Sequence, residues 1–498
     1  MNDDTIRKLV ILGGGTAGWM TAALAARVLG KVIDITLVES EKIDTVGVGE
    51  ATIPPISHFN QALGLDEQAF LKATKATIKL GIQFENWLQQ GSRYMHAFGT
   101  IGKHLPFCDF HHLWLRSRHD GDTSTLWEYS LNYQAAIRNK FAPLAQIAGT
   151  NLPGLSYAYH FDAALYAQFL RRYSEDNGVK RIEGTVREVK VRADSGFIDR
   201  LLLESGQAVG GDLFIDCTGL SALLIEKTLN TGFEDWSHWL PCDRAMAVPS
   251  VAEKPIVPYT RAIAHKAGWQ WRIPLRHRTG NGMVYSSRYW SDVQARDTLM
   301  HNLGTEALSE PRIIRFQTGR RRAQWNKNVI SIGLSSGFLE PLESTSIHLI
   351  QSAATRLIKT FPHRGIRPCE VAEFNRQSQV EIERIRDFII LHYKANQRRD
   401  SPFWQACESM QIPSGLSDKI ALFRTTGKLF RDTNDLFADE AWQQVMIGQG
   451  LLPGDHHIIA SALSQPQLQD LMANLKTLIN GTVNRLPSHE QFLPDDRE

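Results

Sequence analysis

The sequence predicts an α/β fold: a module built on a parallel sheet, a second sheet inserted into it, and a helical part at the C-terminal end. Three observations predict this fold. The first fifty of the 498 residues alternate strand, helix and strand patterns, strand patterns recur over 244–289, and helical spacing dominates after Pro368. With 43% hydrophobic and 22% charged residues, a chain of this length can bury a large core without disulfides or metals.

The N-terminal elements form the beginning of the module. Apolar residues predict a strand over 8–12, followed by a glycine-rich turn over 13–18 and an apolar helix to about Val28. A second strand pattern over 32–39 completes a βαβ unit. Such a unit predicts a parallel sheet, because its crossover helix brings the second strand back in the same direction.

The turn fits G-x-G-x-x-G, the pattern that holds a dinucleotide. Gly13 allows the tight turn, Gly15 lets a pyrophosphate approach the backbone, and Gly18 lets the helix pack on the strand. Glu39 ends the second strand 21 positions after Gly18, where a carboxylate accepts hydrogen bonds from a ribose diol. We therefore interpret the turn as a dinucleotide site and not as a turn without a ligand. The pieces that complete the module lie far downstream, which favours FAD over NAD, because a simple dehydrogenase places its second half directly after the first.

The next elements lead into a long insertion. Helical spacing covers 66–74, and from Ile78 to Phe84 apolar and polar residues alternate with the period of a half-buried strand. That period directs Lys79 away from the apolar face. From about 90 to 153 the chain is rich in histidine, glycine and aromatic residues with little periodicity, which predicts a loop-rich insertion over a site.

The remaining elements complete the module and then change character. We expect a helix over 161–173, a strand meander over 186–203, a buried strand over 212–217, a sheet over about 240–310, a buried strand over 329–334 and a helix over 346–361. After Pro368 the spacing is largely helical to the end of the chain.

Composition excludes several classes of protein. A balance of 55 basic and 53 acidic side chains leaves a net charge of +2, which gives no electrostatic footprint for nucleic acid. Five cysteines without a C-x-x-C pair indicate a reducing compartment, and the adjacent pairs His111-His112 and His456-His457 lack metal-ligand spacing. The polar N-terminus predicts no signal peptide, and no stretch approaches the roughly 18 apolar residues of a membrane span. We expect a cytoplasmic protein that binds no nucleic acid, membrane or metal.

Five blocks of the sequence, in the same order, resemble the flavin-dependent halogenases of the tryptophan-halogenase family. The blocks are residues 13–20, 47–54, 79–87, 269–274 and 333–345. The resemblance implies an FAD-binding Rossmann-like module of the flavin-monooxygenase type over 1–365, with the insertion and the sheet described above, and a helical C-terminal substrate part over 366–498.

The resemblance also implies a reaction in stages. Reduced FAD and oxygen oxidise a bound chloride or bromide to hypohalous acid, which travels to a separate pocket. There Lys79 holds it, by a hydrogen bond or as a haloamine, and an electron-rich aromatic ring attacks the halogen. Glu343 matches the family glutamate that stabilises the positive charge developing on the ring or polarises the halogenating species. From the residues alone, the alternatives are an exposed strand lysine and an acid at a helix N-terminus.

Cofactor and halide positions follow from the same resemblance. For FAD they are Gly13, Gly15, Thr16, Ala17, Gly18, Glu39, Glu50, Ala51, Val186, Leu334 and Ile347. Backbone groups of Thr345 and Ser346 bind the halide. The family carries glycine where Ser346 stands, so we expect a tighter pocket and an altered choice between chloride and bromide.

For the substrate, the resemblance implies ring stacking by His96 and Phe98, with Glu343 nearby. Trp269 and Trp271 share one strand face and, in the family, separate the flavin from the substrate pocket; a core aromatic pair is the alternative. Members that act on free tryptophan hold its carboxylate and amine with a tyrosine pair, and residues 439–450 contain none. We therefore expect an indole or another electron-rich aromatic without that zwitterion.

The expected partners complete the hypothesis. No second nucleotide fingerprint follows the first, so we expect a separate NAD(P)H-dependent flavin reductase to supply reduced FAD. A homodimer is expected by analogy with the family. Two alternatives stay open: an FAD-dependent aromatic monooxygenase, which needs its substrate beside the flavin and no lysine, and a non-catalytic flavoprotein.

Overall fold

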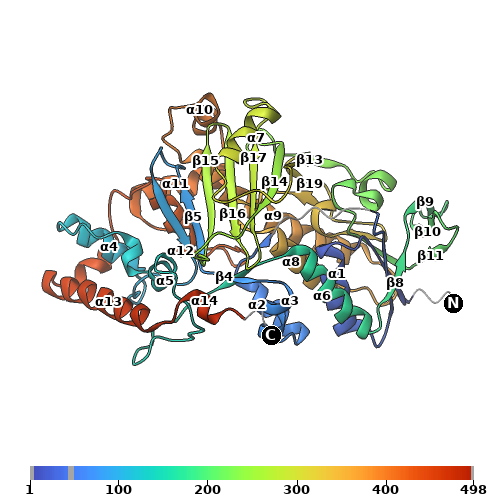
Figure 1. Cartoon of the computed structure of the whole chain (residues 1–498), viewed down its shortest axis with the longest axis horizontal. Helices are drawn as coiled ribbons and strands as arrows, with labels where there is room; N and C mark the ends of the chain where they lie inside the picture. Colours follow the sequence, from blue (N-terminus) through green and yellow to red (C-terminus); the bar gives the residue numbers. More distant parts are fainter. Residues whose placement is uncertain (1–4, 43–49, 495–498) are drawn as a thin grey trace. The chain divides into compact units, whose positions relative to one another are not determined.

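The computed structural model of the protein describes residues 5–42 and 50–494 (Figure 1). The chain divides into two compact units: unit 1 comprises Met1–Ala76, Phe161–Pro241 and Arg315–Glu383, and unit 2 comprises Thr77–His160, Cys242–Ile314 and Arg384–Glu498. These stretches alternate along the chain, whereas the sequence predicts a single boundary, at residue 365. That single division into domains stays a prediction. Of the family-like block over 47–54, residues 47–49 lie outside the described residues.

Unit 1 is built on a six-stranded sheet with the order β20-β21-β12-β1-β2-β8. Its strands are β1 (Lys8–Leu12), β2 (Asp34–Glu39), β8 (Lys180–Glu183), β12 (Leu213–Asp216), β20 (Trp325–Asn326) and β21 (Val329–Ser331). Neighbouring strands are parallel except β20 and β21. Strands inside a parallel sheet are covered on both faces, which is why they are continuous apolar runs. The predicted βαβ opening and the buried strands downstream are confirmed.

Helices pack on this sheet and on one another. They are α1 (Thr16–Leu29), α2 (Pro55–Leu63), α3 (Glu67–Ala73), α6 (Ala163–Asp176) and α8 (Ser346–Lys359). Helix α1 contacts β1 and β2 and also α6 and α8, and Figure 1 shows α1, α6 and α8 side by side. Because α1 is enclosed in this way, nine consecutive residues from Gly18 to Ala26 are buried, which explains its alanine-rich sequence. The helices predicted in these regions are confirmed.

Two small antiparallel sheets complete unit 1. One joins β9 (Val186–Val191), β10 (Ile198–Leu203) and β11 (Ala208–Gly210), and it confirms the predicted meander. The other joins β13 (Phe233–Asp235), β19 (Gly319–Arg321) and β22 (Gly337–Phe338).

Unit 2 is built on a seven-stranded sheet with the order β18-β14-β17-β16-β15-β5-β6. Its strands are β5 (Gly81–Glu85), β6 (Arg93–Ala97), β14 (Arg244–Ser250), β15 (Thr260–His265), β16 (Gly268–Pro274), β17 (Thr279–Tyr285) and β18 (Arg312–Arg315). Figure 1 shows β14 to β17 as long neighbouring strands. The sheet expected at about 240–310 is confirmed, and β15 also pairs in parallel with β5, which comes from far upstream.

The prediction of a single half-buried strand over 78–84 is wrong. The chain forms two short strands, β4 (Thr77–Lys79) and β5, and β4 pairs with β7 (Ala158–Phe161), not with the large sheet. Both faces of β4 are covered, and Lys79 is 0% exposed. The alternation of polar and apolar residues therefore did not mark a solvent face here, because the polar residue of the pattern is itself buried.

The prediction of a loop-rich insertion over about 90–153 is partly wrong. It contains β6, α4 (Phe110–His119) and α5 (Leu131–Ile137), joined by irregular segments. Six consecutive residues at the start of α4, from Phe110 to Leu115, are buried, and they include both histidines of the pair. A helix that is buried on most sides and carries buried histidines has no clear apolar stripe, so its periodicity is lost in the sequence.

The C-terminal part is largely helical, as predicted. Its helices are α9 (Pro368–Lys394), α10 (Pro402–Ser409), α11 (Ser414–Thr426), α12 (Asp439–Gly448), α13 (Gln465–Arg485) and α14 (His489–Phe492). Helix α13 packs against α4 and α5. Within residues 5–42 and 50–494, no helix combines the length and the apolar character needed to cross a membrane.

Four histidines in unit 2 predict an acid-sensitive stability. Burial lowers the pKa of His111, His265 and His489 to about 4 and that of His112 to about 3. Below about pH 6.5 these histidines bind protons in the unfolded chain but stay neutral in the folded protein. Their contribution to the stability of the fold is therefore present above pH 6.5 and is lost as the pH falls toward 4. We expect the free energy of unfolding from urea titrations to fall by up to about 1.4 kcal/mol per pH unit for each histidine.

A matched pair of variants tests this dependence. His112→Asn keeps an acceptor for the backbone N–H of His457, which donates to His112 Nδ1, but it removes the titrating ring. It should flatten the slope between pH 6.5 and 4.5, whereas His119→Gln, which replaces an exposed histidine, should leave the slope unchanged. An identical slope for all three proteins would contradict the assignment.

Candidate functional site

The turn between β1 and α1 has the geometry that the glycine motif predicts. Gly13 adopts φ +114, and a Cβ there would lie 2.3 Å from the carbonyl oxygen of Cys217, just beyond β12. Residues 13–17 are partly exposed, although the strand before them and the helix after them are buried. The backbone at the N-terminus of α1 is therefore accessible, and a helix N-terminus favours a phosphate.

Glu39 lies beside this turn, at the end of β2. One of its carboxylate oxygens accepts a hydrogen bond from Arg181 Nε at 2.6 Å, and the other accepts one from the indole Nε1 of Trp19 at 3.3 Å. The backbone N–H of Gly184 donates to the Glu39 carbonyl, which brings Val186 and the start of β9 to the same end of the sheet. The acid is thus held in place next to the glycine turn, where a ribose would lie.

Segments far apart in the sequence meet at the other side of the turn. Ala17 lies against Gly333, which also approaches Ile350 of α8, and Leu334 follows in the same short helix, Gly333–Ser335. Burial raises the pKa of the Glu50 carboxyl, in β3 (Glu50–Ala51), to about 7. All the residues predicted for FAD belong to unit 1, and an open glycine backbone, a fixed acid and a helix N-terminus fit the group.

The predicted halide segment forms the start of α8. Ser344 has φ +58, and Thr345 precedes the first turn of the helix, so the chain bends sharply before Ser346. Glu343 ends the short helix Pro341–Glu343 and is 0% exposed. A buried bend at a helix N-terminus is suited to an anion. Glu343 belongs to unit 1, and Lys79 belongs to unit 2.

Lys79 lies in β4 with an aromatic ring against its charge. Its Nζ is 5.3 Å from the ring centroid of Phe98. Thr77 shares its face of the strand by the period of two, and Thr77 pairs with His160 of β7, so His160 is the diagonal neighbour of Lys79. Lys79 is therefore enclosed by protein, with the Phe98 ring near its charge and His160 beside it on the neighbouring strand.

Hydrogen bonds fix the tautomer of His160. The Thr77 hydroxyl donates to the carbonyl oxygen of Pro274 at 2.6 Å, so at 3.0 Å from His160 it accepts from Nδ1–H. The Thr260 hydroxyl then donates to His160 Nε2 at 2.9 Å. Burial, followed by the charge of Lys79, lowers the pKa of His160 well below its ordinary value. His160 is neutral, so it adds no second positive charge beside Lys79.

The backbone around Lys79 is also fixed by distant segments. His489 of α14 accepts from the backbone N–H of Ile78 through Nε2 and donates to the Ile256 carbonyl through Nδ1. The N–H of Leu80 donates to Pro258, and its carbonyl accepts from the N–H of Phe98. The lysine thus stands on a rigid support, which catalytic positioning requires.

His96 and Phe98 belong to an aromatic cluster of unit 2. We define the aromatic cluster as His96, Phe98, Phe388, Phe437 and Trp442. The His96 ring lies 5.8 Å from Phe388, 6.1 Å from Phe437 and 6.3 Å from Phe98, measured between centroids. Phe388 in turn lies 3.9 Å from Phe437 and 4.7 Å from Trp442. Through Phe98, this cluster reaches Lys79.

Trp269 and Trp271 lie on β16 and are buried. Their ring centroids are 6.1 Å apart, which agrees with the shared strand face that the sequence predicts. Trp269 also contacts Trp87, at 6.3 Å. The pair is therefore part of the packed aromatic interior of unit 2, and its role as a partition stays a prediction.

Sequence reasoning missed several residues around Lys79. His160, Thr260 and His489 lie within apolar or mixed segments that carry no motif. Phe388 and Trp442 lie in helices with the spacing of a core, and Phe437 lies just before α12. What they share is proximity to Lys79 or His96 across long sequence distances. A single sequence contains no signal of such proximity.

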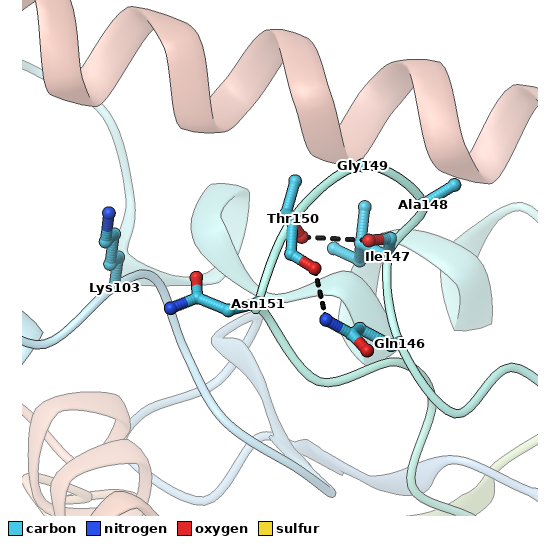
Figure 2. Close-up of a pocket in the computed structure, with 7 residues that line it drawn as sticks. All are labelled: Lys103, Gln146, Ile147, Ala148, Gly149, Thr150 and Asn151. Atoms are coloured by element: carbon cyan, nitrogen blue, oxygen red, sulfur yellow. Dashed lines mark hydrogen bonds between the residues drawn. The ribbon is translucent and has the colours of Figure 1, made fainter.

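Two other features could form a site: a cluster of metal-ligating side chains and a surface hollow. In the described residues, no group of three or more histidine, cysteine, aspartate or glutamate side chains could hold a metal ion. An open hollow of about 640 Å³ lies over the loop that carries Gln146 to Asn151, with Lys103 at its edge (Figure 2). Hydrogen bonds within the loop, from Thr150 Oγ1 to the Ile147 carbonyl among them, hold its shape. None of the predicted site residues lines it.

Comparison with known proteins gives one family. The family model described as tryptophan halogenase matches residues 8–465. Tryptophan 6-halogenase SttH from Streptomyces toxytricini is 38% identical over 526 aligned residues, which cover 99% of this chain and 98% of that protein. Xcc4156, a flavin-dependent halogenase from Xanthomonas campestris, has a TM-score of 0.95 and 48% identity and covers 98% of both chains. BrvH, a flavin-dependent halogenase from Brevundimonas sp. BAL3, has a TM-score of 0.95 and 46% identity over 99% of both chains.

Proposed function

Because the chain belongs to the tryptophan halogenase family and is a flavin-dependent halogenase, we propose that it uses reduced FAD, oxygen and chloride or bromide to halogenate an indole or another electron-rich aromatic. The resemblance found in the sequence is thereby confirmed. The observation that carries the proposal is the placement of Lys79: a buried lysine against the Phe98 ring, beside a histidine that stays neutral.

Unit 1 holds the cofactor in this proposal. The turn at Gly13, Gly15 and Gly18 and the start of α1 bind the pyrophosphate, Glu39 binds the ribose, and Ala17, Leu334 and Ile347 line the path to the ring system. The remaining predicted cofactor positions are Thr16, Glu50, Ala51 and Val186. When bound, reduced FAD supplies with oxygen the two-electron oxidation of the halide. Backbone groups of Thr345 and Ser346 hold that halide.

Lys79 holds the product of this oxidation, hypohalous acid. The ammonium donates a hydrogen bond to its oxygen, or the neutral amine forms a haloamine with release of water. An electron-rich ring carbon then attacks the halogen: the carbon–halogen bond forms, the bond from halogen to oxygen or nitrogen breaks, and the ring loses its proton. Glu343, a buried carboxylate at the bend before α8, stabilises the cationic ring before that loss.

The substrate proposed is an aromatic without an amino-acid zwitterion. Its ring lies against His96 and Phe98, and Trp269 and Trp271 keep it apart from the flavin. SttH acts on tryptophan, but α12 of the present chain carries no tyrosine pair, and its buried face contributes Trp442 to the aromatic cluster. A site that offers aromatic surface and no paired groups for a carboxylate and an amine favours a plain indole or phenol.

The partners follow from the same proposal. A separate NAD(P)H-dependent flavin reductase supplies reduced FAD, because one nucleotide fingerprint occurs in the sequence. Association as a homodimer belongs to the proposal by analogy.

The test combines the purified protein with a flavin reductase, FAD, NADH, bromide and a panel of indoles and phenols. We expect products that gain one bromine, seen as a doublet of equal intensity in the mass spectrum, and chlorinated products when chloride replaces bromide. A panel without any halogenated product, with reduced FAD still consumed, would overturn the proposal. Hydroxylated product instead would indicate the aromatic monooxygenase.

A further inference from the structure

Gln444 joins α12 to the strand that carries His96 and Phe98. Its side chain is 1% exposed, so both of its polar atoms need partners within the protein. Oε1 accepts from the backbone N–H of Ala97 at 3.0 Å, and Nε2 donates to the carbonyl oxygen of Ala97 at 2.9 Å. Ala97 is the residue between His96 and Phe98, so a single side chain holds both backbone groups of that position.

The place of Ala97 in the sheet explains why such a partner is needed. Strand β6 is the last strand of the seven-stranded sheet, so within residues 5–42 and 50–494 no strand pairs with its outer edge. The backbone N–H of Phe98 donates to the carbonyl of Leu80, on the inner side of β6. The backbone groups of successive residues in an antiparallel strand point to opposite edges, so the N–H and carbonyl of Ala97 point outward. Gln444 supplies there the two hydrogen bonds that another strand would give.

A second contact fixes α12 on the same strand. Gly448 lies directly over Tyr94, and a Cβ at Gly448 would come within 2.3 Å of the Tyr94 ring. The helix is therefore anchored on β6 at two points one helical turn apart, at Gly448 and at Gln444. Side chains of Tyr94, His96 and Phe98 share one face of the extended chain, so fixing the backbone of Ala97 fixes the direction of the rings on either side of it.

We propose that Gln444 is a positioning residue for halogenation, which sets the substrate-stacking rings of His96 and Phe98 relative to Lys79. This inference rests on the proposed function. The two hydrogen bonds hold the backbone between the rings of His96 and Phe98, and neither involves a residue of unit 1. Loss of the two hydrogen bonds between Gln444 and Ala97 should therefore lower the rate of ring halogenation and leave halide oxidation unchanged.

The first experiment compares Gln444→Met with Gln443→Met. Methionine keeps the length and burial of glutamine but makes neither hydrogen bond. Gln443 is 2% exposed on the same helix, and its Nε2 has no hydrogen-bond partner in the part of the chain that the structure describes. For Gln444→Met we expect about a tenfold loss of kcat/KM for indole, mainly through a higher KM, with more than one brominated regioisomer and an unchanged rate of reduced-FAD consumption. Gln443→Met should behave like the wild type.

A second variant keeps the test valid if Gln444→Met fails to fold. In Gln444→Glu, a protonated carboxyl can replace the amide, because its carbonyl accepts from the Ala97 N–H and its hydroxyl donates to the Ala97 carbonyl. The carboxylate lacks the donor and places a second negative oxygen against that carbonyl. Its product yield, divided by the wild-type yield at the same pH, should therefore rise as the pH falls. Relief of a buried charge alone would give Gln443→Glu, at the neighbouring buried position, the same recovery, so the recovery must be larger for Gln444→Glu.

The outcomes separate the two proposals. A wild-type protein that brominates indole, together with a Gln444→Met variant of equal kcat/KM and regioselectivity, would overturn the role of Gln444 and leave the proposed function standing. A pH-independent ratio for Gln444→Glu would also overturn that role. A wild-type protein that brominates no aromatic would overturn both proposals.

Discussion

Replacement of Lys79 by alanine is expected to lower the yield of halogenated product by about 100-fold or more, while oxygen continues to reoxidise reduced FAD. The loss follows from the position of Lys79, because it is the buried cation that lies against the Phe98 ring, and its removal leaves hypohalous acid without a holder near the substrate. The measurement is product by mass spectrometry per mole of NADH consumed. Free hypohalous acid, trapped by added methionine as the sulfoxide, should rise in step with the loss.

Two further variants make this result specific. Lys79→Arg keeps a positive charge but offers a guanidinium that stays protonated, so it should retain little product if a haloamine forms and more if a hydrogen bond suffices. Lys103→Ala removes an exposed lysine of the same unit and should match the wild type. Undiminished halogenation by Lys79→Ala would contradict the proposed relay.

The fold was predictable where local physics dominates. The glycine turn, the apolar strand before it and the enclosed helix after it follow from backbone freedom and continuous burial. The two errors have one cause: tertiary packing buries polar residues, so the pattern of polar and apolar residues did not report which faces meet solvent. Lys79 is the polar member of an alternating pattern and yet is buried, and α4 carries histidines on faces that are also buried. At Lys79 the buried polar residue imitated a solvent face, and in α4 the buried histidines left no apolar stripe.

The site was predictable to the extent that its residues lie in contiguous blocks. Lys79, His96 and Glu343 each belong to a short segment with a resemblance, and the structure describes all three. Their supports do not lie in such blocks. His160 is held by Thr260, 100 residues away, and Ala97 is held by Gln444, 347 residues away. Such contacts arise from the topology of the sheet, in which β6 is an open edge, and no local pattern encodes them.

The second large effect concerns the cofactor turn, where Gly13→Ala is expected to weaken FAD binding strongly. Alanine must adopt φ +114, which a side chain resists, and its Cβ would lie 2.3 Å from the backbone oxygen of Cys217. The obstructing atom belongs to the backbone after β12, so it cannot rotate away, and the turn must shift relative to β1 and β12. We expect the Kd for FAD, measured by quenching of flavin fluorescence, to rise by at least about 100-fold, because the pyrophosphate binds to this backbone.

Gly178→Ala is the matched control, because it separates steric obstruction from backbone strain. Gly178 is also in unit 1 and has φ +92, but a Cβ there meets nothing within 4 Å. Strain alone costs about 1 kcal/mol, so this variant should lose some stability and keep its affinity for FAD. Equal affinity of the Gly13→Ala protein and the wild type would mean that FAD does not depend on this turn. Equal loss in both variants would mean that destabilisation of unit 1, and not the obstruction at Cys217, removes the cofactor.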